Sequence, residues 1–313
     1  MTKAAIASLI RPLVEKHIDG LDVTWFESGD QALEIADSVE IGWFDMYDKP
    51  KMAEIITGAT NLKWLNSIYA GIDHFPVEVL RERGTIVTNG TGINAIPIAE
   101  YVVMGMLAAA KRVDKLLESQ ANKDWLNGPP GNTELFESKV LIIGYGAIGQ
   151  QVAKTLSGFQ ADITAVRRTP VDDDSIIGPD EWRPRLGEFD WVIVAAPATD
   201  ETQQMIGAEE LAAMKNSAWL VNVARGSLVD QGALIAALDA KSIGGAFLDT
   251  VTPEPLPSDD PLWSAPNIFI TSHMSGNATT RMFERAAARF VENLKRYRAG
   301  EDMISVVDLD LGY

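Results

Sequence analysis

Short apolar runs alternate with amphipathic helical patterns along most of the chain. In the first hundred residues the runs predict strands at 21–27, 40–45, 62–70 and 85–90. A second alternating series predicts strands at 140–143, 162–166, 191–195, 218–223, 245–248 and 268–270. Strands that alternate with helices favour parallel sheets with helices on both faces. The pattern therefore predicts an α/β protein in two parts.

Three helical patterns bear on where those parts begin and end. The opening residues 4–17 look helical from the start, so no strand is predicted before them. Residues 96–125 predict one long buried helix, and residues 281–300 predict a last helix that returns to the first part. With a border near Ala99, the predicted domains are 1–98 plus 286–313, and 99–285.

A glycine motif, Gly144-Tyr145-Gly146-Ala147-Ile148-Gly149, follows an apolar run directly and opens a helical pattern. This strand–turn–helix context is the one in which G-x-G-x-x-G binds dinucleotides. Gly144 permits the tight turn, Gly146 admits the pyrophosphate, and Gly149 allows close packing of helix and strand. The amides of Ala147 and Ile148 then face the phosphates from a helix N-terminus. The alternative is a glycine-rich turn in a non-binding α/β domain.

Two arginines bear on which dinucleotide is bound. An NAD site usually carries an acidic residue about 20 residues past the glycines. Here Arg167, Arg168 and Thr169 begin 18 residues (167 − 149) after Gly149. Guanidinium and hydroxyl groups suit the 2′-phosphate of NADP(H), and we therefore expect NADP(H) to be preferred, with NAD(H) as a second cofactor. The alternative is a solvated basic turn.

Composition narrows the choice of partners. The chain has 313 residues, and its formal net charge is 27 − 44 = −17. Such a surface repels phosphate backbones and anionic lipid, so neither nucleic acid nor a membrane is expected as a partner. Cysteine is absent, which excludes thiol catalysis and Cys-ligated metals, and no metal is expected. Without a signal-peptide pattern or a bilayer-length apolar run, a cytoplasmic location is the default expectation.

Three polar side chains follow predicted strands of the second series. Arg225 stands in "VNVARGS", Glu254 in "LDTVTPEPLP", and His273 in "NIFITSHMSG". Ligands of open parallel sheets bind at the carboxyl ends of the strands, where the glycine motif also lies. Taken singly, a histidine after a strand is more often structural, and an arginine before a glycine often begins a helix.

These segments together resemble the D-isomer-specific 2-hydroxyacid dehydrogenases. The resemblance rests on "GYGAIGQ", on "LAAMKNSAWLVNVARGSLVDQGALIAALDAKSIGGAFLDTVTPEPLP", on "PLWSAPNIFITSH" and on "SIYAGIDHFP", and it covers most of residues 60–290. It implies two Rossmann-like, doubly wound domains, the first built from both chain ends, with an active site in the cleft between them. It also implies a homodimer.

The resemblance also implies roles for the three polar residues. Arg225 would hold the carboxylate and carbonyl of a small 2-oxo acid through its planar fork of donors. His273 would protonate the carbonyl oxygen during hydride transfer, or act as base when a D-2-hydroxy acid is oxidised. Glu254 would fix the imidazole tautomer and favour the imidazolium.

Further contacts follow from the same resemblance. The backbone of Ala70 and Gly71 would bind the substrate carboxylate, with Tyr69 and Asn94 beside it. The cofactor would also meet the residues Ala196, Pro197, Thr202, Val223, Ala224 and Asp249.

The chain departs from the family pattern in the missing first strand, in Tyr69 where a small residue is common, and in Ser272 where proline is common before the histidine. Two other members of the fold compete with a 2-oxo acid reductase. Formate dehydrogenases carry glutamine in place of Glu254 and have extra N-terminal length, and phosphoglycerate dehydrogenases often carry an added regulatory domain. A different class, a non-catalytic corepressor-like protein that senses nicotinamide cofactors, would also keep the three residues.

Overall fold

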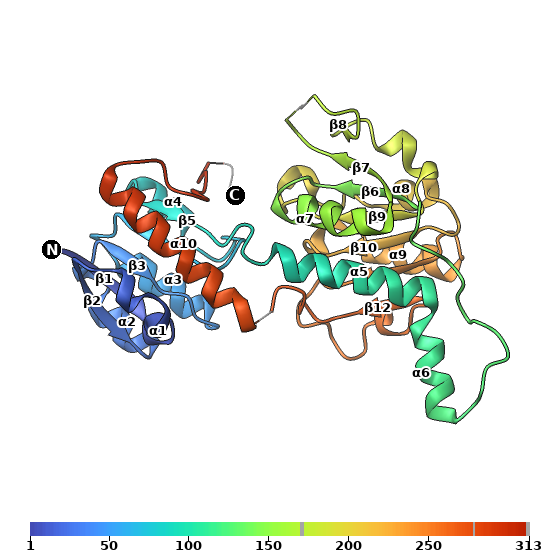
Figure 1. Cartoon of the computed structure of the whole chain (residues 1–313), viewed down its shortest axis with the longest axis horizontal. Coiled ribbons are helices and arrows are strands. Elements are labelled where there is room, and N and C mark those ends of the chain that lie inside the picture. The colour runs from blue at the N-terminus through green and yellow to red at the C-terminus, as the bar shows by residue number, and fades with distance from the viewer. Residues whose placement is uncertain (170–171, 278, 311–313) are drawn as a thin grey trace. The chain divides into compact units, whose positions relative to one another are not determined.

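The computed structural model describes residues 1–169, 172–277 and 279–310. The chain forms two compact units, Met1–Asn94 with Ala278–Tyr313 as unit 1, and Ala95–Asn277 as unit 2 (Figure 1). These borders lie four residues (98 − 94) and eight residues (285 − 277) before the predicted ones. Each of the two helices at the borders therefore belongs whole to one unit.

Unit 1 is built on a five-stranded parallel sheet in the order β2-β1-β3-β4-β5. Its strands are β1 (Thr2–Ala7), β2 (Leu21–Phe26), β3 (Ile41–Trp43), β4 (Trp64–Asn66) and β5 (Ile86–Thr88). Its helices are α1 (Arg11–Val14), α2 (Gly29–Ile35), α3 (Lys49–Gly58), α4 (Val77–Glu82) and α10 (Thr279–Ala299). Short 3-10 turns are at Ser8–Ile10, Glu15–His17 and Ala36–Ser38.

Both faces of this sheet are covered, and β1 shows why. Ala4 and Ile6 pack with the residues of α1 and α10, whereas Ala5 packs with those of α2 and α3. The α10 side is rich in aromatic rings, and Phe290 stacks on Trp64 at 5.1 Å and 17°. Two-sided burial explains why the strands of unit 1 read as apolar runs.

The prediction that no strand precedes the first helix is wrong. Thr2–Ala7 forms β1, which pairs with β2 on one side and β3 on the other. Alanines suit a helix by propensity, but Ala4, Ala5 and Ile6 are fully buried between two layers of helices. Tertiary burial therefore decides the conformation, and the helical structure starts only after Ala7.

Unit 2 contains a seven-stranded parallel sheet in the order β12-β11-β10-β9-β6-β7-β8. The strands are β6 (Lys139–Ile143), β7 (Asp162–Val166), β8 (Ile176–Ile177), β9 (Trp191–Val194), β10 (Trp219–Asn222), β11 (Gly245–Leu248) and β12 (Ile268–Ile270). The helices are α5 (Ala95–Lys111), α6 (Val113–Asn122), α7 (Ala147–Leu156), α8 (Ala208–Ala213) and α9 (Gln231–Asp239). Its 3-10 turns are Ser157–Phe159, Arg183–Glu188, Asp200–Thr202, Gly226–Leu228 and Pro261–Ser264.

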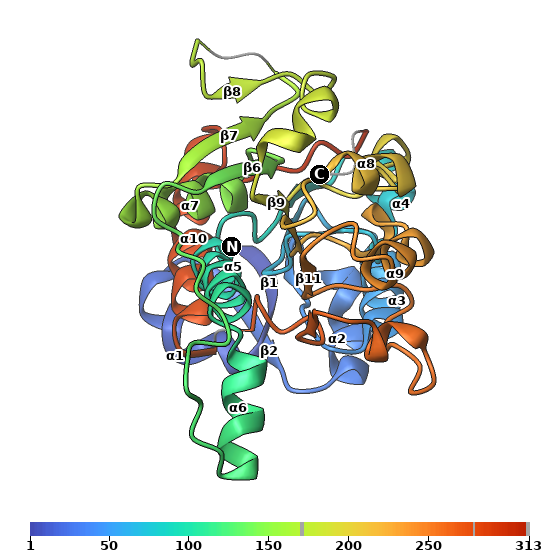
Figure 2. The same cartoon turned by 90° about the vertical axis from the view of Figure 1, so that its right-hand side faces the viewer.

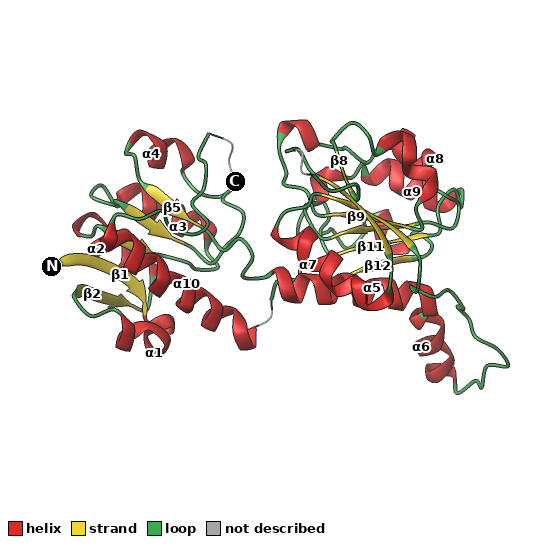
Figure 3. Ribbon diagram, turned by 45° about the horizontal axis from the view of Figure 1, so that its top comes forward, coloured by secondary structure: helices red, strands yellow, loops and turns green. Residues whose placement is uncertain are grey.

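Alternate residues of β6 point to the two layers of helices. Val140 and Ile142 belong to the core beneath α5 and α7, and Leu141 and Ile143 belong to the core beneath α8 and α9. Figure 2 shows these helix pairs on opposite sides of the sheet, and Figure 3 separates the yellow strands from the red helices. The strands are parallel, so their carboxyl ends share one edge of the sheet.

The single long helix predicted for residues 96–125 is also wrong. Arg112 adopts a left-handed conformation with φ 50° and separates α5 from α6. Its guanidinium binds Asp114 in the first turn of α6 at 2.9 and 2.7 Å, which stabilises the break. No residue of α6 is buried, whereas α5 packs closely enough on β11 that Gly105 faces the Phe247 ring. The two-residue strand β8 was not predicted.

Candidate active site

The glycine motif closes β6 onto α7 as its spacing predicts. Gly144 has φ 102°, and a Cβ there would lie 2.5 Å from the Ala196 nitrogen. A Cβ on Gly149 would lie 2.1 Å from the Gly144 oxygen, so the helix and the turn touch. A Cβ on Gly146 would meet nothing within 4 Å, and this residue caps α7 without a side-chain hydrogen bond. The open space and the uncapped amides at this helix N-terminus fit a phosphate group.

The segment after β10 presents Arg225. Asn222, fully buried at the end of β10, accepts a hydrogen bond from the Ala224 amide at 3.0 Å and donates one to the Arg225 oxygen at 2.8 Å. This turn leaves Arg225 half-buried, with Nη1 donating to the Ala224 oxygen at 2.8 Å. A Cβ on Gly226 would lie 2.1 Å from the Val251 carbonyl, so only glycine lets the segments after β10 and β11 touch.

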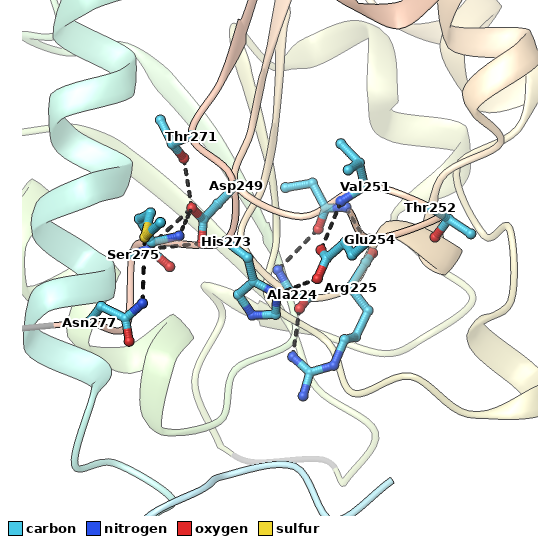
Figure 4. Close-up of polar contacts among 12 residues, drawn as sticks. Ala224, Arg225, Asp249, Val251, Thr252, Glu254, Thr271, His273, Ser275 and Asn277 are labelled. Atoms are coloured by element: carbon cyan, nitrogen blue, oxygen red, sulfur yellow. Dashed lines mark hydrogen bonds and ion pairs between the residues drawn. The ribbon is translucent and has the colours of Figure 1, made fainter. Parts of the chain in front are cut away.

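A carboxylate and an imidazole form the central pair of the site. Nδ1 of His273 lies 2.7 Å from Oε2 of Glu254, and Oε1 of Glu254 accepts from the Val251 amide at 3.2 Å (Figure 4). Both side chains are partly exposed, 44% for His273 and 37% for Glu254. A neutral imidazole that donates from Nδ1 keeps its Nε2 available for a proton transfer.

The histidine loop is fastened to Asp249 at the end of β11. This buried carboxylate accepts hydrogen bonds from the Thr271 hydroxyl at 2.6 Å and from the Met274 and Ser275 amides at 2.8 and 3.1 Å. The backbone amide of His273 donates to the backbone carbonyl oxygen of Asp249 at 2.6 Å. The structure thus uses Asp249 to hold the loop, and its predicted contact with the cofactor stays a prediction.

The remaining predicted cofactor residues lie at the same edge of the unit 2 sheet. Arg167, Arg168 and Thr169 follow β7 and are exposed, and the Arg167 amide donates to the Ile177 oxygen of β8 at 3.0 Å. The other predicted contacts follow β9 and β10: Ala196, Val223 and Ala224 are buried, and the Pro197 oxygen accepts from the Thr202 hydroxyl at 2.8 Å.

In unit 1 the predicted substrate residues lie after β4 and β5. The Tyr69 oxygen accepts from the Gly90 amide at 2.8 Å, and the Ala70 oxygen accepts from Asn89 Nδ2 at 2.7 Å. In a trans peptide the N–H points opposite to the C=O, so the amides of Ala70 and Gly71 point away from β5. Neither amide donates to an acceptor within the described residues. Two neighbouring unpaired amides can bind an anion when the chain orients both toward it.

Tyr69 directly precedes this turn, and Asn94 lies near the end of the unit's first segment, after β5. The Tyr69 hydroxyl donates to the Met46 oxygen at 3.0 Å, and burial of the ring raises the pKa of Tyr69 to about 12. The side-chain oxygen of Asn94 is buried and accepts no hydrogen bond within the described residues. Such an oxygen is an acceptor that a ligand's donor could satisfy.

Two supporting residues were not found from the sequence. Asn222 shapes the arginine turn, and Asp45 accepts three hydrogen bonds beside the Ala70–Gly71 amides. Each is a polar residue just after or at the end of an apolar strand, which is a signal in the sequence but a weak one, because other polar residues at strand ends share it. In the described ranges no group of three or more His, Cys, Asp or Glu side chains could hold a metal ion, and no helix could span a bilayer.

The sequence matches one family model, described as "D-isomer specific 2-hydroxyacid dehydrogenase, NAD binding domain", over residues 103–275. The chain is 33% identical over 304 residues to the "Glyoxylate/hydroxypyruvate reductase B" of Pectobacterium carotovorum, covering 95% of this chain and 93% of that one. The chain therefore belongs to the D-isomer-specific 2-hydroxyacid dehydrogenases, which are oxidoreductases.

Two solved structures are similar over nearly the whole chain. A D-isomer specific 2-hydroxyacid dehydrogenase family protein from Aeromonas salmonicida has a TM-score of 0.87 and 27% identity, covering 99% of both chains. A D-isomer specific 2-hydroxyacid dehydrogenase from Xanthobacter autotrophicus, in complex with NADPH and MES, has a TM-score of 0.80 and 28% identity, covering 100% of this chain and 99% of that one. These likenesses confirm the predicted fold of two parallel-sheet α/β domains.

Proposed function

We propose that the chain reduces small 2-oxo acids, such as glyoxylate or hydroxypyruvate, to D-2-hydroxy acids with NADPH. The observation that carries this proposal is the 2.7 Å contact between Glu254 and Nδ1 of His273, which aligns the imidazole and reserves Nε2. The Pectobacterium relative is named for the reduction of these two acids. A family enzyme with an intact pair and an arginine on the adjacent strand end has the groups that this reaction needs.

The reduction divides among three side chains. NADPH, when bound, supplies the hydride that reduces the carbonyl carbon of the substrate. Arg225 holds the substrate through charge-assisted hydrogen bonds, to which its planar fork is suited. His273 donates the Nε2 proton to the carbonyl oxygen, so the product is a hydroxyl group and the imidazole becomes neutral. Glu254 keeps the proton on Nδ1 throughout and stabilises the imidazolium before the transfer.

The cofactor is assigned to the glycine turn and the residues after β7. The amides at the α7 N-terminus, Ala147 and Ile148, would hold the pyrophosphate. Arg167, Arg168 and Thr169 would bind the 2′-phosphate, which is why NADPH is preferred over NADH. The similar Xanthobacter structure holds NADPH. The residues after β9 and β10, together with Asp249, are proposed to surround the adenosine and the nicotinamide.

The substrate carboxylate is assigned in part to unit 1. The Ala70 and Gly71 amides point away from β5 and have no acceptor within the described residues, which suits a carboxylate oxygen. The unpaired Asn94 oxygen is a second candidate contact. Tyr69 next to the turn would limit the size of the substrate side chain.

The proposal is tested with a panel of 2-oxo acids assayed against NADPH and NADH, following the absorbance of the reduced nicotinamide. We expect NADPH-dependent turnover of at least one small 2-oxo acid and its loss in His273→Ala. A chain that binds NADPH but reduces none of the acids would contradict the proposal and favour the corepressor-like alternative. Turnover of formate or of 3-phosphoglycerate alone would favour the corresponding family member.

A homodimer is proposed from the exposed apolar surface of unit 2. The exposed large apolar side chains on α6 and the segment after it are Leu116, Leu117, Trp125, Leu126 and Phe136, and Trp125 is 95% exposed. Exposed apolar side chains on one helix and the segment after it suit a protein interface, and we infer the homodimer from them. Leu117→Asp with Trp125→Asp should convert a dimer to a monomer in light scattering, whereas Leu9→Asp, on a leucine of unit 1 that is at least as exposed as Leu117, should not. A wild-type monomer would contradict this proposal.

The cytoplasm is the proposed location, since the chain has no cysteine that an oxidising compartment would pair. The net charge of −17 is the reason that no nucleic-acid partner is proposed.

A further inference from the structure

A carboxylate stands behind the Ala70–Gly71 turn of unit 1 without a role in the reaction described above. Asp45, two residues after β3, accepts hydrogen bonds from the Ser67 hydroxyl, the Ile68 amide and Trp43 Nε1, each at 2.6 Å. It forms no ion pair with a cation in the described part of the chain. Desolvation, only partly offset by these hydrogen bonds, raises the pKa of Asp45 to about 6.

The hydrogen bonds continue from Asp45 into the turn. The Ser67 hydroxyl, which donates to Asp45, also accepts from the Tyr69 amide at 3.0 Å. The Tyr69 hydroxyl returns to the Met46 oxygen next to Asp45. Each backbone amide from Ile68 to Tyr69 is therefore fastened, directly or through one hydroxyl, to the end of β3.

The end of β5 holds the other side of the same segment. Gly90 donates to the Tyr69 oxygen, and Asn89 donates to the Ala70 oxygen. The fit is close, because a Cβ on Gly90 would lie 1.8 Å from the Ile68 oxygen. The segment is thus held through its amides by groups near β3 and through its carbonyls by groups after β5. Together these hydrogen bonds fix the orientation of the peptide planes that lead into the turn.

We propose that Asp45 is a positioning residue for the substrate carboxylate: through Ile68 and Ser67 it orients the Ala70 and Gly71 amides. The inference rests on the proposed function, in which these amides bind the 2-oxo acid. A carboxylate is required because its two oxygens can accept from three donors at once. An asparagine would offer one acceptor and turn an NH2 group toward donors, which would release part of the turn.

Two opposing effects determine the result of that substitution. Removing the charge of Asp45 would lessen its repulsion of an anionic substrate, whereas releasing the turn would weaken the two amide contacts. We expect the second effect to dominate. Each hydrogen bond to Asp45 is short and directed, whereas the repulsion between Asp45 and the substrate carboxylate acts over a longer distance and is screened by solvent. The phenol of Tyr69 is a titratable group that interacts with Asp45.

The test compares Asp45→Asn with Glu40→Gln, a control at the opposite end of the same strand whose carboxylate pairs with exposed Lys63. We expect Asp45→Asn to raise the KM for the 2-oxo acid about tenfold, the loss typical of one charge-assisted hydrogen bond. The kcat should change less than threefold, and the NADPH dissociation constant, from nicotinamide fluorescence, should not change. Glu40→Gln should leave all three values at the wild-type level.

Ser67→Ala is the second variant, and it remains informative if Asp45→Asn fails to fold. It should raise the same KM, and the double variant should raise it by less than the product of the two single effects, since both residues act through one chain of hydrogen bonds. An unchanged or lowered KM in both single variants would overturn the role of Asp45. Absence of wild-type 2-oxo acid turnover would instead contradict the proposed function itself.

Discussion

The two units bring polar groups to the carboxyl edges of their sheets in different ways. Unit 2 places ionisable side chains there, Arg225 after β10 and the Glu254–His273 pair after β11 and β12. Unit 1 places backbone amides there, those of Ala70 and Gly71, and keeps its ionised side chain behind them. Chemistry that moves a proton needs a titratable side chain, whereas recognition of a carboxylate needs only oriented donors.

This difference predicts how each unit responds to mutation. In unit 2 the replaced side chain is itself proposed to react with or hold the substrate, so kcat or kcat/KM should respond. In unit 1 the replaced side chain only supports the group that binds, so the KM should respond. The KM of Asp45→Asn tests the unit 1 side of this contrast, and four further outcomes sharpen it, from the largest effect to the smallest.

His273→Ala should lower kcat for 2-oxo acid reduction by about 10²–10⁴-fold, the usual contribution of a positioned general acid. NADPH affinity should stay within a factor of about two, because the glycine turn is on another strand. Steady-state kinetics and fluorescence titration measure the two quantities. Turnover near the wild-type rate would remove His273 from the mechanism.

Arg225→Lys keeps the charge but loses the planar fork. We expect kcat/KM for the 2-oxo acid to fall by about 10²-fold. One of the two charge-assisted hydrogen bonds is lost, and the lysine side chain is shorter than that of arginine. Arg183→Lys is the matched control, because Arg183 forms a surface ion pair with Glu210. Equal kinetics for the Arg225 and Arg183 variants would mean that Arg225 acts only as a point charge.

Replacing Arg167 and Arg168 together by alanine tests the cofactor assignment. The wild-type KM should be lower for NADPH than for NADH, and the double variant should lose this preference by a factor of about ten or more, while its use of NADH changes little. Salt weakens exposed charge pairs, so the preference should also shrink as ionic strength rises. A wild-type enzyme with equal constants for both cofactors would show that the arginines do not contact the 2′-phosphate.

The smallest effect concerns the pH dependence of stability in unit 1. Because the pKa of Asp45 is raised from 3.8 to about 6, the folded chain binds this proton more tightly than the unfolded chain does. The resulting stabilisation is complete below about pH 4 and is lost as the pH rises through about 6, a change of about 3 kcal/mol at most. Between pH 4.5 and 7.5, the thermal midpoint of the wild type should therefore fall relative to that of Asp45→Asn. Parallel curves for the two proteins would rule this out.

Much of the fold could be predicted because two-sided burial leaves a clear pattern. The strands β7, β11 and β12 have the bounds that their apolar runs predict. The strand β1 could not be recognised, because alanines leave no period and only the surrounding helices decide the conformation of Thr2–Ala7. The break at Arg112 depends on one left-handed residue, whose side chain gives no sign of it in the sequence.

The candidate site divides along the same line. The residues proposed to act through their own chemistry, Arg225, Glu254 and His273, could be selected by type and place, and the structure brings Glu254 and His273 into contact. Asn222 and Asp45, which accept backbone hydrogen bonds, are not recognisable from the sequence. A polar residue at a strand end could equally well be exposed and form its hydrogen bonds with water. Their partners are distant in sequence or depend on a turn that only the folded chain forms.

The backbone at His273, the proposed general acid, has a consequence for engineering. Ser272 and His273 both lie in the left-handed region, at φ 53° and 56°, where residues other than glycine are strained. Glycine at position 272 would relieve that strain, and a selection for heat resistance alone would favour it. The same change would let the imidazole swing away from Glu254. An enzyme that acquires Ser272→Gly should therefore have a higher thermal midpoint and a lower turnover number. Position 272 should be kept as serine in any library designed for stability.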